Sequence, residues 1–369
     1  MNTFLSIVLG AASIAISACS PQQKPASTDE QALSVENTDA VLSETDSARV
    51  LTIAVCGDIM MGTTYPTVQL PANGGADIFS DVTPVLSAAD VACGNLEGAM
   101  ADGGSSTKRG GANSYSFRMP TSFTPLLTSA GFDFLSMANN HANDFGAQGI
   151  TSTERCLREQ NIGFAGIKGH QEYAIKEING VRYGFCAFGH NQYTLRTQDI
   201  ATVQRIVKTL ADSCDIVIVS FHGGAEGPRY KHLPRGKETF LGEDRGDLRA
   251  FARVCIDAGA DLVYGHGPHV TRAVDIYKGR FIAYSLGNFC TPYGMSLGGV
   301  NAYAPVIEVK LDERGNFLEG KIHSFVQQRG VGPRKDESNA PAREIKMLTE
   351  ADVPDAALKI GDDGSIELK

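Results

Sequence analysis

Short apolar runs alternate with helix-like stretches along the chain from Arg49 onward. The runs lack the alternation of polar and apolar positions that marks a half-exposed strand, and they occupy 50–56, 90–93, 133–137, 215–221 and 261–264. Apolar runs of this kind are typical of strands buried on both faces of a parallel sheet. Helices are predicted at 123–130, 151–160, 200–211 and 247–258. The pattern therefore predicts an α/β fold.

The last third of the chain has a different pattern. Strand-like segments follow one another there with hardly a helix between them, at 272–277, 280–285, 304–311 and 321–328. This favours antiparallel pairs that complete or face the first sheet, and hence a layered sandwich with helices outside and sheets packed within. We expect one large domain over 49–330, followed by a C-terminal extension over 331–369.

The first 19 residues have the character of a secretory signal. The stretch from Met1 to Ala18 is almost wholly apolar or small, and it is too short and too rich in Ala and Ser for a comfortable membrane span. It ends in Ile16-Ser17-Ala18-Cys19, which resembles a bacterial lipobox, where the cysteine is lipidated. No Lys or Arg precedes the apolar run, so an ordinary signal peptide with a chance cysteine is the alternative. We expect lipidation at Cys19.

Residues 20–48 are rich in Ser, Thr, Pro, Gln and acidic residues. A segment with so few large apolar residues cannot offset its ordering entropy, so it is predicted to be a flexible linker. Together with a lipid at Cys19, the linker would tether the folded domain to a membrane. The expected location is the bacterial cell envelope, on the periplasmic or the outer surface.

The composition limits which partners and which kinds of site are expected for this chain. The chain of 369 residues is 42% hydrophobic and has a net charge of −9, which argues against a general affinity for nucleic acid. Seven cysteines follow Cys19 without a close CxxC pair, so a structural zinc site is poorly supported. They are interpreted as small buried hydrophobes, and their odd number leaves at least one thiol free.

Five of the strand-like runs end in polar residues that can bind metal or transfer a proton. These residues are Asp58, Asn95 with Glu97, Asn140 with His141, His222, and His266 with His269. Any one of them alone is more often a turn former, a helix cap or a surface residue. Because functional groups gather at the carboxyl ends of strands in α/β sheets, five repeats of the same placement predict one shared centre.

Carboxylate, amide and imidazole groups form a ligand set for a divalent ion such as Mn, Zn, Fe or Mg. Such a site, with open positions, can activate water at neutral pH. Basic residues in nearby loops, at Arg118 and from Arg229 to Lys237, favour an anionic ligand such as phosphate or a polycarboxylate. A solvated surface run is the alternative interpretation of these charges.

The chain resembles the bacterial capsule-synthesis, poly-γ-glutamate (CapA-type) family, whose fold belongs with the calcineurin-like metallophosphoesterases. The matching motifs occur in the family order between about Val50 and Phe325. They are Gly57-Asp58-Ile59-Met60, Asn95-Leu96-Glu97-Gly98, Phe117-Arg118-Met119-Pro120, Ala138-Asn139-Asn140-His141 with Asp144 and Gly146, His222-Gly223-Gly224-Ala225-Glu226, Gly265-His266-Gly267-Pro268-His269, and Tyr284-Ser285-Leu286-Gly287-Asn288-Phe289.

The resemblance implies a four-layer α/β/β/α sandwich with a metal centre at the strand ends. The chain departs from the phosphoesterase pattern at two positions, and both departures are shared with the capsule-type family. Met60 replaces a histidine ligand, and Asn95 replaces a bridging aspartate. An amide cannot bridge two cations as a carboxylate does. Either Glu97 supplies the bridging charge, or one of two metal positions is weak or empty. We expect at least one metal ion.

The site residues are assigned on this basis. The predicted metal ligands are Asp58, Glu97, Asn140, His222, His266 and His269. The predicted catalytic residues are His141, as the proton-transfer group, and Glu226, for which a supporting role beside the ligands is the alternative. The predicted substrate-binding residues are Asn95, Arg118, Arg229 and Asn288.

Three functions remain open at this stage. The first is a tethered, metal-dependent hydrolase or transferase acting on an anionic envelope polymer or a small anionic substrate. The second is a non-catalytic binding or scaffold subunit of a capsule synthesis or export complex. The third is a plain phosphoesterase, against which the methionine at position 60 counts.

Overall fold

The computed structural model describes residues 49–108 and 115–369. The predicted signal segment, the lipidation site Cys19 and the linker 20–48 lie outside the described residues. Residues 49–369 belong to one compact unit. Within the described ranges, none of the helices combines the length and the apolar character needed to cross a membrane.

The first sheet has nine strands and is partly parallel and partly antiparallel. Its strands are β1 (Leu51–Ile59), β2 (Val91–Leu96), β5 (Phe134–Ser136), β6 (Gly163–Ala165), β15 (Asn288–Cys290), β16 (Val306–Leu311), β17 (Phe317–His323), β20 (Leu358–Ile360) and β21 (Ser365–Leu368). Their order is β20-β21-β17-β16-β1-β2-β5-β6, and β15 also pairs with β1. Strands β1, β2, β5 and β6 run parallel to one another. Strands β16, β17, β21 and β20 each pair antiparallel with their neighbours.

The second sheet has six strands in the order β13-β14-β12-β9-β8-β7. They are β7 (Tyr173–Ile178), β8 (Val181–Gly189), β9 (Ile216–His222), β12 (Leu262–His266), β13 (Val274–Tyr277) and β14 (Arg280–Ala283). The four inner strands run parallel, and the two edge strands are antiparallel to their neighbours.

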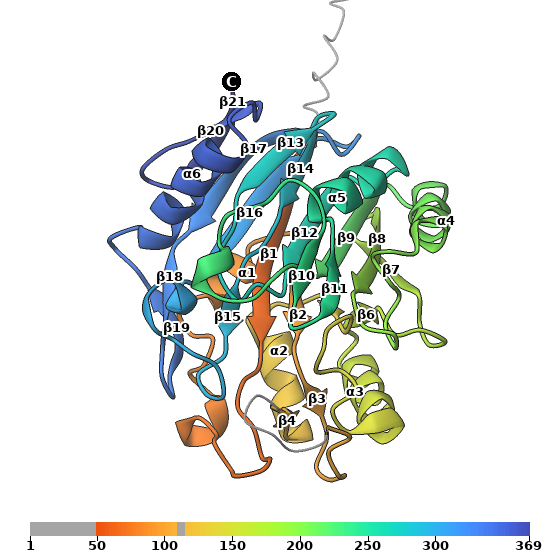
Figure 1. Ribbon diagram of the computed structural model, residues 1–369, viewed down its shortest axis with the longest axis vertical. Coiled ribbons are helices and arrows are strands. Elements are labelled where there is room, and N and C mark those ends of the chain that lie inside the picture. Colours follow the sequence, from red (N-terminus) through yellow and green to blue (C-terminus); the bar gives the residue numbers. More distant parts are fainter. Residues whose placement is uncertain (1–48, 109–114) are drawn as a thin grey trace, which may run out of the picture. The chain divides into compact units, whose positions relative to one another are not determined.

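The two sheets pack face to face through a shared apolar core (Figure 1). Phe134 of the first sheet stacks on Phe185 of the second, with ring centroids 5.3 Å apart. The hydroxyl of Tyr264 in β12 donates to the carbonyl of Gly94 in β2 at 3.1 Å, so a hydrogen bond also crosses between the sheets. This packing fixes the position of one set of strand ends relative to the other.

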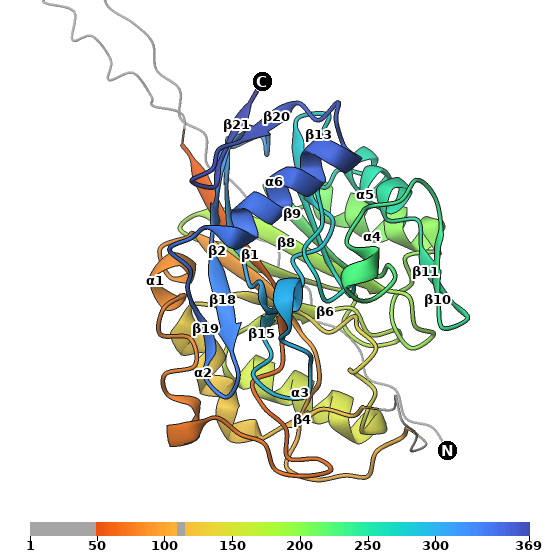
Figure 2. The ribbon, with the colours of Figure 1, turned by 60° about the vertical axis from the view of Figure 1, so that its left-hand side comes forward.

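Helices cover the outer faces of both sheets (Figure 2). On the first sheet they are α1 (Thr83–Leu86), α2 (Thr124–Ala130) and α3 (Gly146–Glu159), and on the second α4 (Ile200–Ala211) and α5 (Leu248–Asp257). A sixth helix, α6 (Ala340–Asp352), packs on β13 and β17. The expected four-layer α/β/β/α sandwich is therefore confirmed, and α4 has the bounds that the sequence predicts.

The folded domain extends beyond its predicted end at residue 330. Residues predicted as an extension form α6, β20 and β21, and β21 pairs with β17 to widen the first sheet. The buried side chains of Ile345, Leu348 and Ile366 belong to the main core. The described chain from 49 to 369 is therefore a single folding unit.

Three small two-stranded sheets complete the described structure. They pair β3 (Ala99–Met100) with β4 (Arg118–Met119), β10 (Glu238–Phe240) with β11 (Glu243–Gly246), and β18 (Phe325–Gln328) with β19 (Gly332–Lys335). The β10–β11 hairpin lies beside the loops that follow the strands of the second sheet and becomes part of the site described below (Figure 1).

Aspartates at the starts of parallel strands have a structural role. Each accepts a hydrogen bond from a backbone N–H of the neighbouring strand, at 2.7–3.1 Å, and these aspartates are Asp90, Asp133, Asp215 and Asp261. The first N–H of a strand at the sheet end would otherwise lack a partner. The carboxylates therefore cap one end of the sheets, whereas the metal-binding residue types gather at the opposite end.

The seven described cysteines are all free thiols. Six are buried, and Cys214 is partly exposed. Burial raises the pKa of Cys56, Cys93 and Cys255 well above the usual value, so these thiols stay protonated. The interpretation as small buried hydrophobes is confirmed for the six buried cysteines, and Cys214 departs from it.

Candidate metal centre

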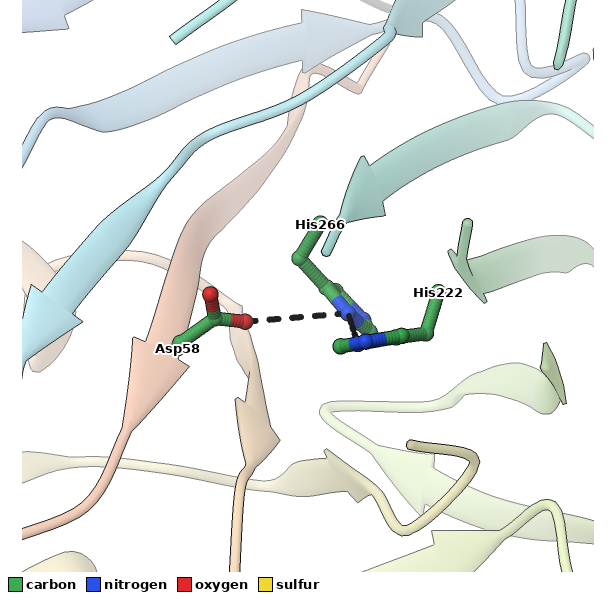
Figure 3. A group of neighbouring side chains, drawn as sticks. All are labelled: Asp58, His222 and His266. Atoms are coloured by element: carbon green, nitrogen blue, oxygen red, sulfur yellow. Dashed lines mark hydrogen bonds and ion pairs between the residues drawn. The ribbon is translucent and has the colours of Figure 1, made fainter. Parts of the chain in front are cut away.

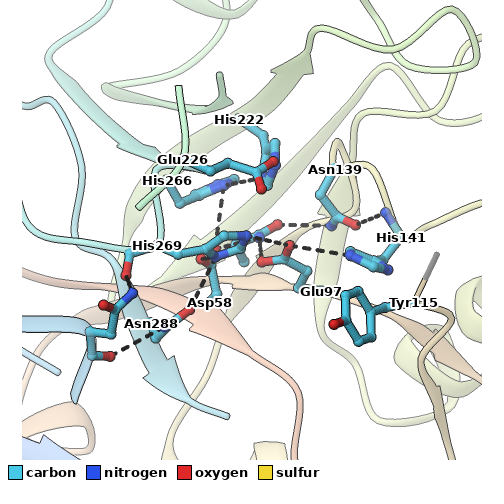
Figure 4. Close-up of polar contacts among 12 residues, drawn as sticks. Asp58, Glu97, Tyr115, Asn139, His141, His222, Glu226, His266, His269 and Asn288 are labelled. Carbon is cyan, nitrogen blue, oxygen red and sulfur yellow. Dashed lines mark hydrogen bonds and ion pairs between the residues drawn. The ribbon is translucent and has the colours of Figure 1, made fainter. Parts of the chain in front are cut away.

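The polar residues at the strand ends converge on one point from both sheets (Figure 4). In the first sheet, the strand register places Asp58 of β1 beside Asn95 of β2 and Asn288 of β15. In the second sheet, His222 of β9 lies beside His266 of β12. Because the sheets pack face to face, these two sets of side chains meet.

A glycine before Asp58 permits a close backbone contact at this point. A Cβ atom on Gly57 would overlap the carbonyl oxygen of Gly287. The N–H of Asp58 donates to that same carbonyl at 2.9 Å, where the register of β1 is irregular. Glycine is therefore needed to bring β1, at Asp58, against the start of β15, at Asn288.

The first candidate ligand group consists of Asp58, His222 and His266 (Figure 3). Nδ1 of His266 lies 3.0 Å from Nδ1 of His222 and 3.7 Å from Oδ1 of Asp58. Nε2 of His266 is 2.9 Å from the hydroxyl of Ser220, which fixes the orientation of the ring. All three residues are fully buried.

The second candidate group consists of Asp58, Glu97 and His269. Nδ1 of His269 lies 3.0 Å from Oδ2 of Asp58, and its Nε2 lies 3.7 Å from Oε1 of Glu97. In each group the potential ligand atoms lie within 4.8 Å of one another. The two groups share Asp58, so Asp58, and not Glu97, is the carboxylate placed between two adjacent candidate positions.

Orphaned polar atoms show that these residues fit a divalent cation. Oε1 of Glu97, Oδ1 of Asn140 and Nε2 of His222 are buried without a hydrogen-bond partner among the described residues. An unsatisfied buried acceptor costs about 1–3 kcal/mol. Carboxylate and amide oxygens with neutral imidazoles suit such an ion. Five of the six predicted ligands belong to the two groups, and the sixth, Asn140, lines the cavity described below.

Asn95 has a different role from the predicted contact with substrate. It is fully buried, and its Nδ2 donates to Oδ1 of Asp58 at 2.8 Å and to Oε2 of Glu97 at 3.4 Å. Its Oδ1 accepts from Nδ2 of Asn139 at 3.0 Å. The amide is thus used within the protein, and it holds the two carboxylates together.

Burial and nearby charges set the protonation of the second group. Burial alone would raise the pKa of Asp58, but the hydrogen bond and charge of His269 bring the pKa below its usual value. Burial, reinforced by the charge of Asp58, raises the pKa of Glu97 well above the usual range. Against the effect of burial, the charges of Glu97 and Asp58 raise the pKa of His269 to about 10.

The two histidines of the second sheet are held neutral. Burial lowers the pKa of His266 to about 4. Burial, followed by the charge of His266, lowers the pKa of His222 well below its usual value. Neutral imidazole is the form that binds a metal ion, so these two side chains need not lose a proton first.

His141 lies beside the second group and is oriented by a carboxylate. Its Nδ1 donates to Oδ2 of Asp144 at 2.8 Å, while its Nε2 lies 3.9 Å from Oε1 of Glu97. The Phe117 ring packs against the imidazole, with centroids 4.3 Å apart. Burial lowers the pKa of His141, so the neutral ring can accept a proton at Nε2.

A cavity of about 720 Å³ opens over this centre. Asn140, His141 and His269 line it next to the centre, and so does Asn288, which stays a predicted substrate contact. Its other walls are aromatic, apolar or charged, and include Lys108, Tyr115, Phe117, Tyr193, Glu226, Phe240, Leu241, Glu243, Arg245 and Met295. The predicted centre therefore has room for a ligand beside it.

The two arginines predicted to bind substrate do not line the cavity. Arg118 donates from Nε to the Thr64 hydroxyl at 2.9 Å and from Nη1 to the Gly104 carbonyl at 3.0 Å. Arg229 lies in a short 3-10 helix, Pro228–Tyr230, away from the cavity walls. The basic loop that follows faces α6 instead, where Lys231 pairs with Glu344 at 2.9 Å.

The sequence patterns did not indicate the β10–β11 hairpin or the charged residues that it brings to the site. Arg245 of β11 pairs with Glu226 at 2.7 Å and with Glu243 at 3.1 Å. Glu226, predicted as catalytic, does line the cavity, but one of its oxygens is bound to this guanidinium. No motif in the hairpin marks these residues, because the site includes them only through folding.

The chain is similar in sequence to bacterial capsule-synthesis proteins. Residues 52–293 match the family described as bacterial capsule synthesis protein PGA_cap. The capsule biosynthesis protein CapA of Bacillus anthracis is 26% identical over 302 residues, covering 77% of this chain and 69% of that protein. The PGA biosynthesis protein CapA of Bacillus subtilis is 29% identical over 267 residues, covering 68% and 66%.

Among solved structures, a hypothetical protein from Thermus thermophilus is similar at 16% identity with a TM-score of 0.48. That alignment covers 75% of this chain and 99% of the other.

Proposed function

Because the chain belongs to the bacterial capsule synthesis protein PGA_cap family, we propose that it is a metal-dependent hydrolase or transferase acting on an envelope polymer of the poly-γ-glutamate type. Relatives named for capsule and PGA biosynthesis support this polymer class. The chain spans about two thirds of their length. The predicted signal and lipidation site at Cys19 complete the proposal of an exported, membrane-tethered protein that works with a capsule-synthesis complex.

One observation carries the enzymatic proposal. Two ligand groups share Asp58 at the strand ends, and His269 of one group lines an open cavity next to His141. A divalent ion held there would supply a Lewis acid that polarises a carbonyl or phosphoryl oxygen. A purely structural metal site would have no need of an adjacent cavity with a proton-transfer residue on its wall.

The chain's own residues have distinct proposed roles around that ion. Asp144 holds the proton on Nδ1 of His141, which leaves Nε2 to exchange a proton with the reacting group. Asn288 accepts from Nδ1 of His269 at 3.1 Å and donates to the Asn301 carbonyl at 3.2 Å, so it orients the His269 ring. Asn95 keeps the carboxylates of Asp58 and Glu97 in place.

The test compares metal content and turnover in matched variants of the full chain. The site variant is His266→Ala with His269→Ala. The control is His170→Ala with His232→Ala, which removes two partly exposed histidines that pair with Glu154 and Asp352. The metal content is measured by mass spectrometry. Turnover is measured on poly-γ-glutamate, on cell-wall peptides and on an aryl phosphodiester. We expect the site variant to lose metal and turnover, and the control to keep both.

Three outcomes contradict parts of this proposal. Equal metal content in the two variants would refute the site. Metal and polymer binding without turnover on any substrate would refute the enzymatic role and leave a binding subunit. Turnover of the phosphodiester alone would replace the polymer by a small phosphoester as substrate.

A further inference from the structure

One wall of the cavity carries a rigid group of three charges. Glu226 follows β9, whereas Glu243 and Arg245 belong to β11. The Arg245 guanidinium is bound on two sides, at 2.7 Å by Glu226 and at 3.1 Å by Glu243, and it lies 5.3 Å from the Phe240 ring centroid. Arg245 is only 3% exposed. We call these three residues the acidic triad, since two carboxylates surround one guanidinium.

The acidic triad has an excess negative charge that faces the cavity. The side chains of Glu226 and Glu243 are 24% and 52% exposed, so a ligand can reach both, whereas Arg245 lies behind them. Arg245 neutralises one carboxylate and leaves a net charge of about −1. The wall therefore attracts a cationic group and repels an anionic one.

The other two described cations of the cavity, Lys108 and the protonated His269, do not offset this charge. His269 lies 3.0 Å from Asp58 and 3.7 Å from Glu97, which match its charge. Lys108 pairs with Oδ1 of Asp144 at 2.7 Å. Arg118 and Arg229 do not line the cavity. Among the described lining residues, each cation is thus already matched by a carboxylate, and the excess charge of the acidic triad stays uncompensated.

A second, independent feature indicates that this wall is incomplete without a ligand. His190 is 5% exposed, and its Nε2 has no hydrogen-bond partner among the described residues, although Oε2 of Glu243 lies 3.4 Å away. Buried polar atoms are normally satisfied, so the unpartnered Nε2 of His190 requires an explanation, which a ligand bound at this wall would supply.

The proposed polymer presents two kinds of charge. In a γ-linked glutamate chain, every unit carries a free α-carboxylate, and the unit at the amino end carries in addition the chain's single ammonium group. An interior unit would bring its carboxylate against Glu226 and Glu243. The amino end would instead bring an ammonium group that can donate charge-assisted hydrogen bonds to both.

We propose that the acidic triad binds the terminal ammonium group of the polymer, so that the centre acts at the amino end of the chain and not within it. This inference rests on the proposed function, and it specifies which part of the substrate enters the cavity. It also explains why a protein acting on a polyanion lines its cavity with carboxylates.

The experiment uses two γ-glutamate oligomers of equal length, one with a free amino end and one N-acetylated. Each is titrated calorimetrically into the full chain loaded with metal at neutral pH. We expect the free amine to bind about tenfold more tightly, as one charge-assisted contact would give. Glu243→Gln should remove most of this preference, whereas Glu319→Gln, which changes an exposed glutamate on β17, should keep it.

A second measurement stays decisive if Glu243→Gln disturbs the hairpin. Raising the pH through the ligand's own amine pKa, about 7.7–8.0 for an α-amino group, removes the ammonium charge. The preference for the free amine over the acetylated oligomer should disappear in the unchanged protein. Affinity of the acetylated oligomer at each pH corrects for changes in the protein.

Equal or tighter binding of the acetylated oligomer overturns the inference, and so does failure of both oligomers to bind. The proposed function fails on other grounds, namely when the His266→Ala and His269→Ala variant keeps its metal. An enzyme that cleaves both oligomers equally well would keep the proposed function and lose the preference for the amino end.

Discussion

Nδ1 of His269 lies 3.0 Å from Oδ2 of Asp58, although 211 residues separate the two along the chain. Asp58 ends β1 of the first sheet, whereas His269 lies in the loop after β12 of the second. His269 has a positive φ of 57°, which is uncommon for a residue other than glycine. The surrounding loop therefore holds His269 in a costly conformation that places its imidazole on the carboxylate.

The buried amide of Asn95 should be needed for the centre to form without metal. Asn95→Asp removes the donor to Asp58 and Glu97 and places a third carboxylate beside them. We expect the metal-free protein to lose about 1–3 kcal/mol of unfolding free energy. Added divalent ion should recover most of this loss, because the cation neutralises the extra charge. Urea unfolding with chelator and with metal measures both effects.

Asn179→Asp is the matched control, since Asn179 lies exposed between β7 and β8. It should leave the unfolding free energy almost unchanged in both conditions. A loss for Asn95→Asp no larger than that of this control would contradict the role assigned to Asn95.

The metal-free protein should be most stable near pH 6.5. The lowered pKa of His266, about 4, means that the unfolded chain binds the proton more readily. Stability is therefore lost as the pH falls from about 6.5 towards 4, by about 3 kcal/mol in total. The raised pKa of His269, about 10, has the opposite sign, so stability is lost as the pH rises from about 6.5 towards 10.

The urea midpoint measured in chelator between pH 4.5 and 9.5 tests this, at roughly half-unit steps across both windows. His266→Asn should flatten the acidic side of the profile, and His269→Asn the alkaline side. A profile that both variants leave unchanged would show that other groups control the stability.

The short contact between β9 and β12 leaves no room beside Gly265. A Cβ atom there would overlap the Phe221 ring and lie 2.7 Å from the Tyr284 carbonyl oxygen. Gly265→Ala should therefore displace His266 and weaken metal binding by at least about tenfold, with a stability loss of roughly 1–3 kcal/mol. Metal titration and thermal unfolding measure these effects.

Gly103→Ala is the control, because nothing lies within 4 Å of the added atom. It should bind metal like the unchanged protein. Normal metal affinity in Gly265→Ala would mean that His266 is not held by this packing.

The carboxylate of Asp144 should determine the tautomer of His141. It accepts from Nδ1 of His141 at 2.8 Å and from the N–H of Phe117 at 2.7 Å. Asp144→Asn weakens the first contact, so the proton should redistribute towards Nε2, and turnover should fall by about 10–100-fold. Nitrogen NMR shifts of a His141-labelled protein report the tautomer independently of activity.

Asp102→Asn provides a comparison, since Asp102 binds Thr121 near the surface. It should leave the His141 tautomer unchanged. The assigned role of Asp144 is wrong if its variant keeps the proton on Nδ1.

The sequence by itself determined the layers and the candidate ligands. Strand-like runs without polar alternation, as at 215–221, require burial on both faces, so they predict a covered parallel sheet before any packing is known. Polar residues at the ends of such runs, such as Asp58 and His222, predict a shared edge because parallel strands end on the same side. These are local patterns, so they can be recognised in the amino-acid sequence alone.

Tertiary structure decided which charges meet. The sequence suggested Arg118 and Arg229 as substrate contacts from their proximity to site motifs, but neither lines the cavity in the folded chain. It brings in Arg245 and Glu243 instead, from a hairpin without a motif. Nearness along the chain does not give the direction of a side chain, which depends on how loops pack.

The packing of the two sheets also decided the roles of the residues within the centre. The sequence excluded Asn95 as a bridging group, and it left open whether Glu97 supplies the bridging charge or one metal position is weak or empty. Only the face-to-face packing of the sheets places Asp58 between both ligand groups and buries the Asn95 amide behind it. The identity of the donors is a property of the sequence, whereas their distances are a property of two sheets that meet about one apolar core.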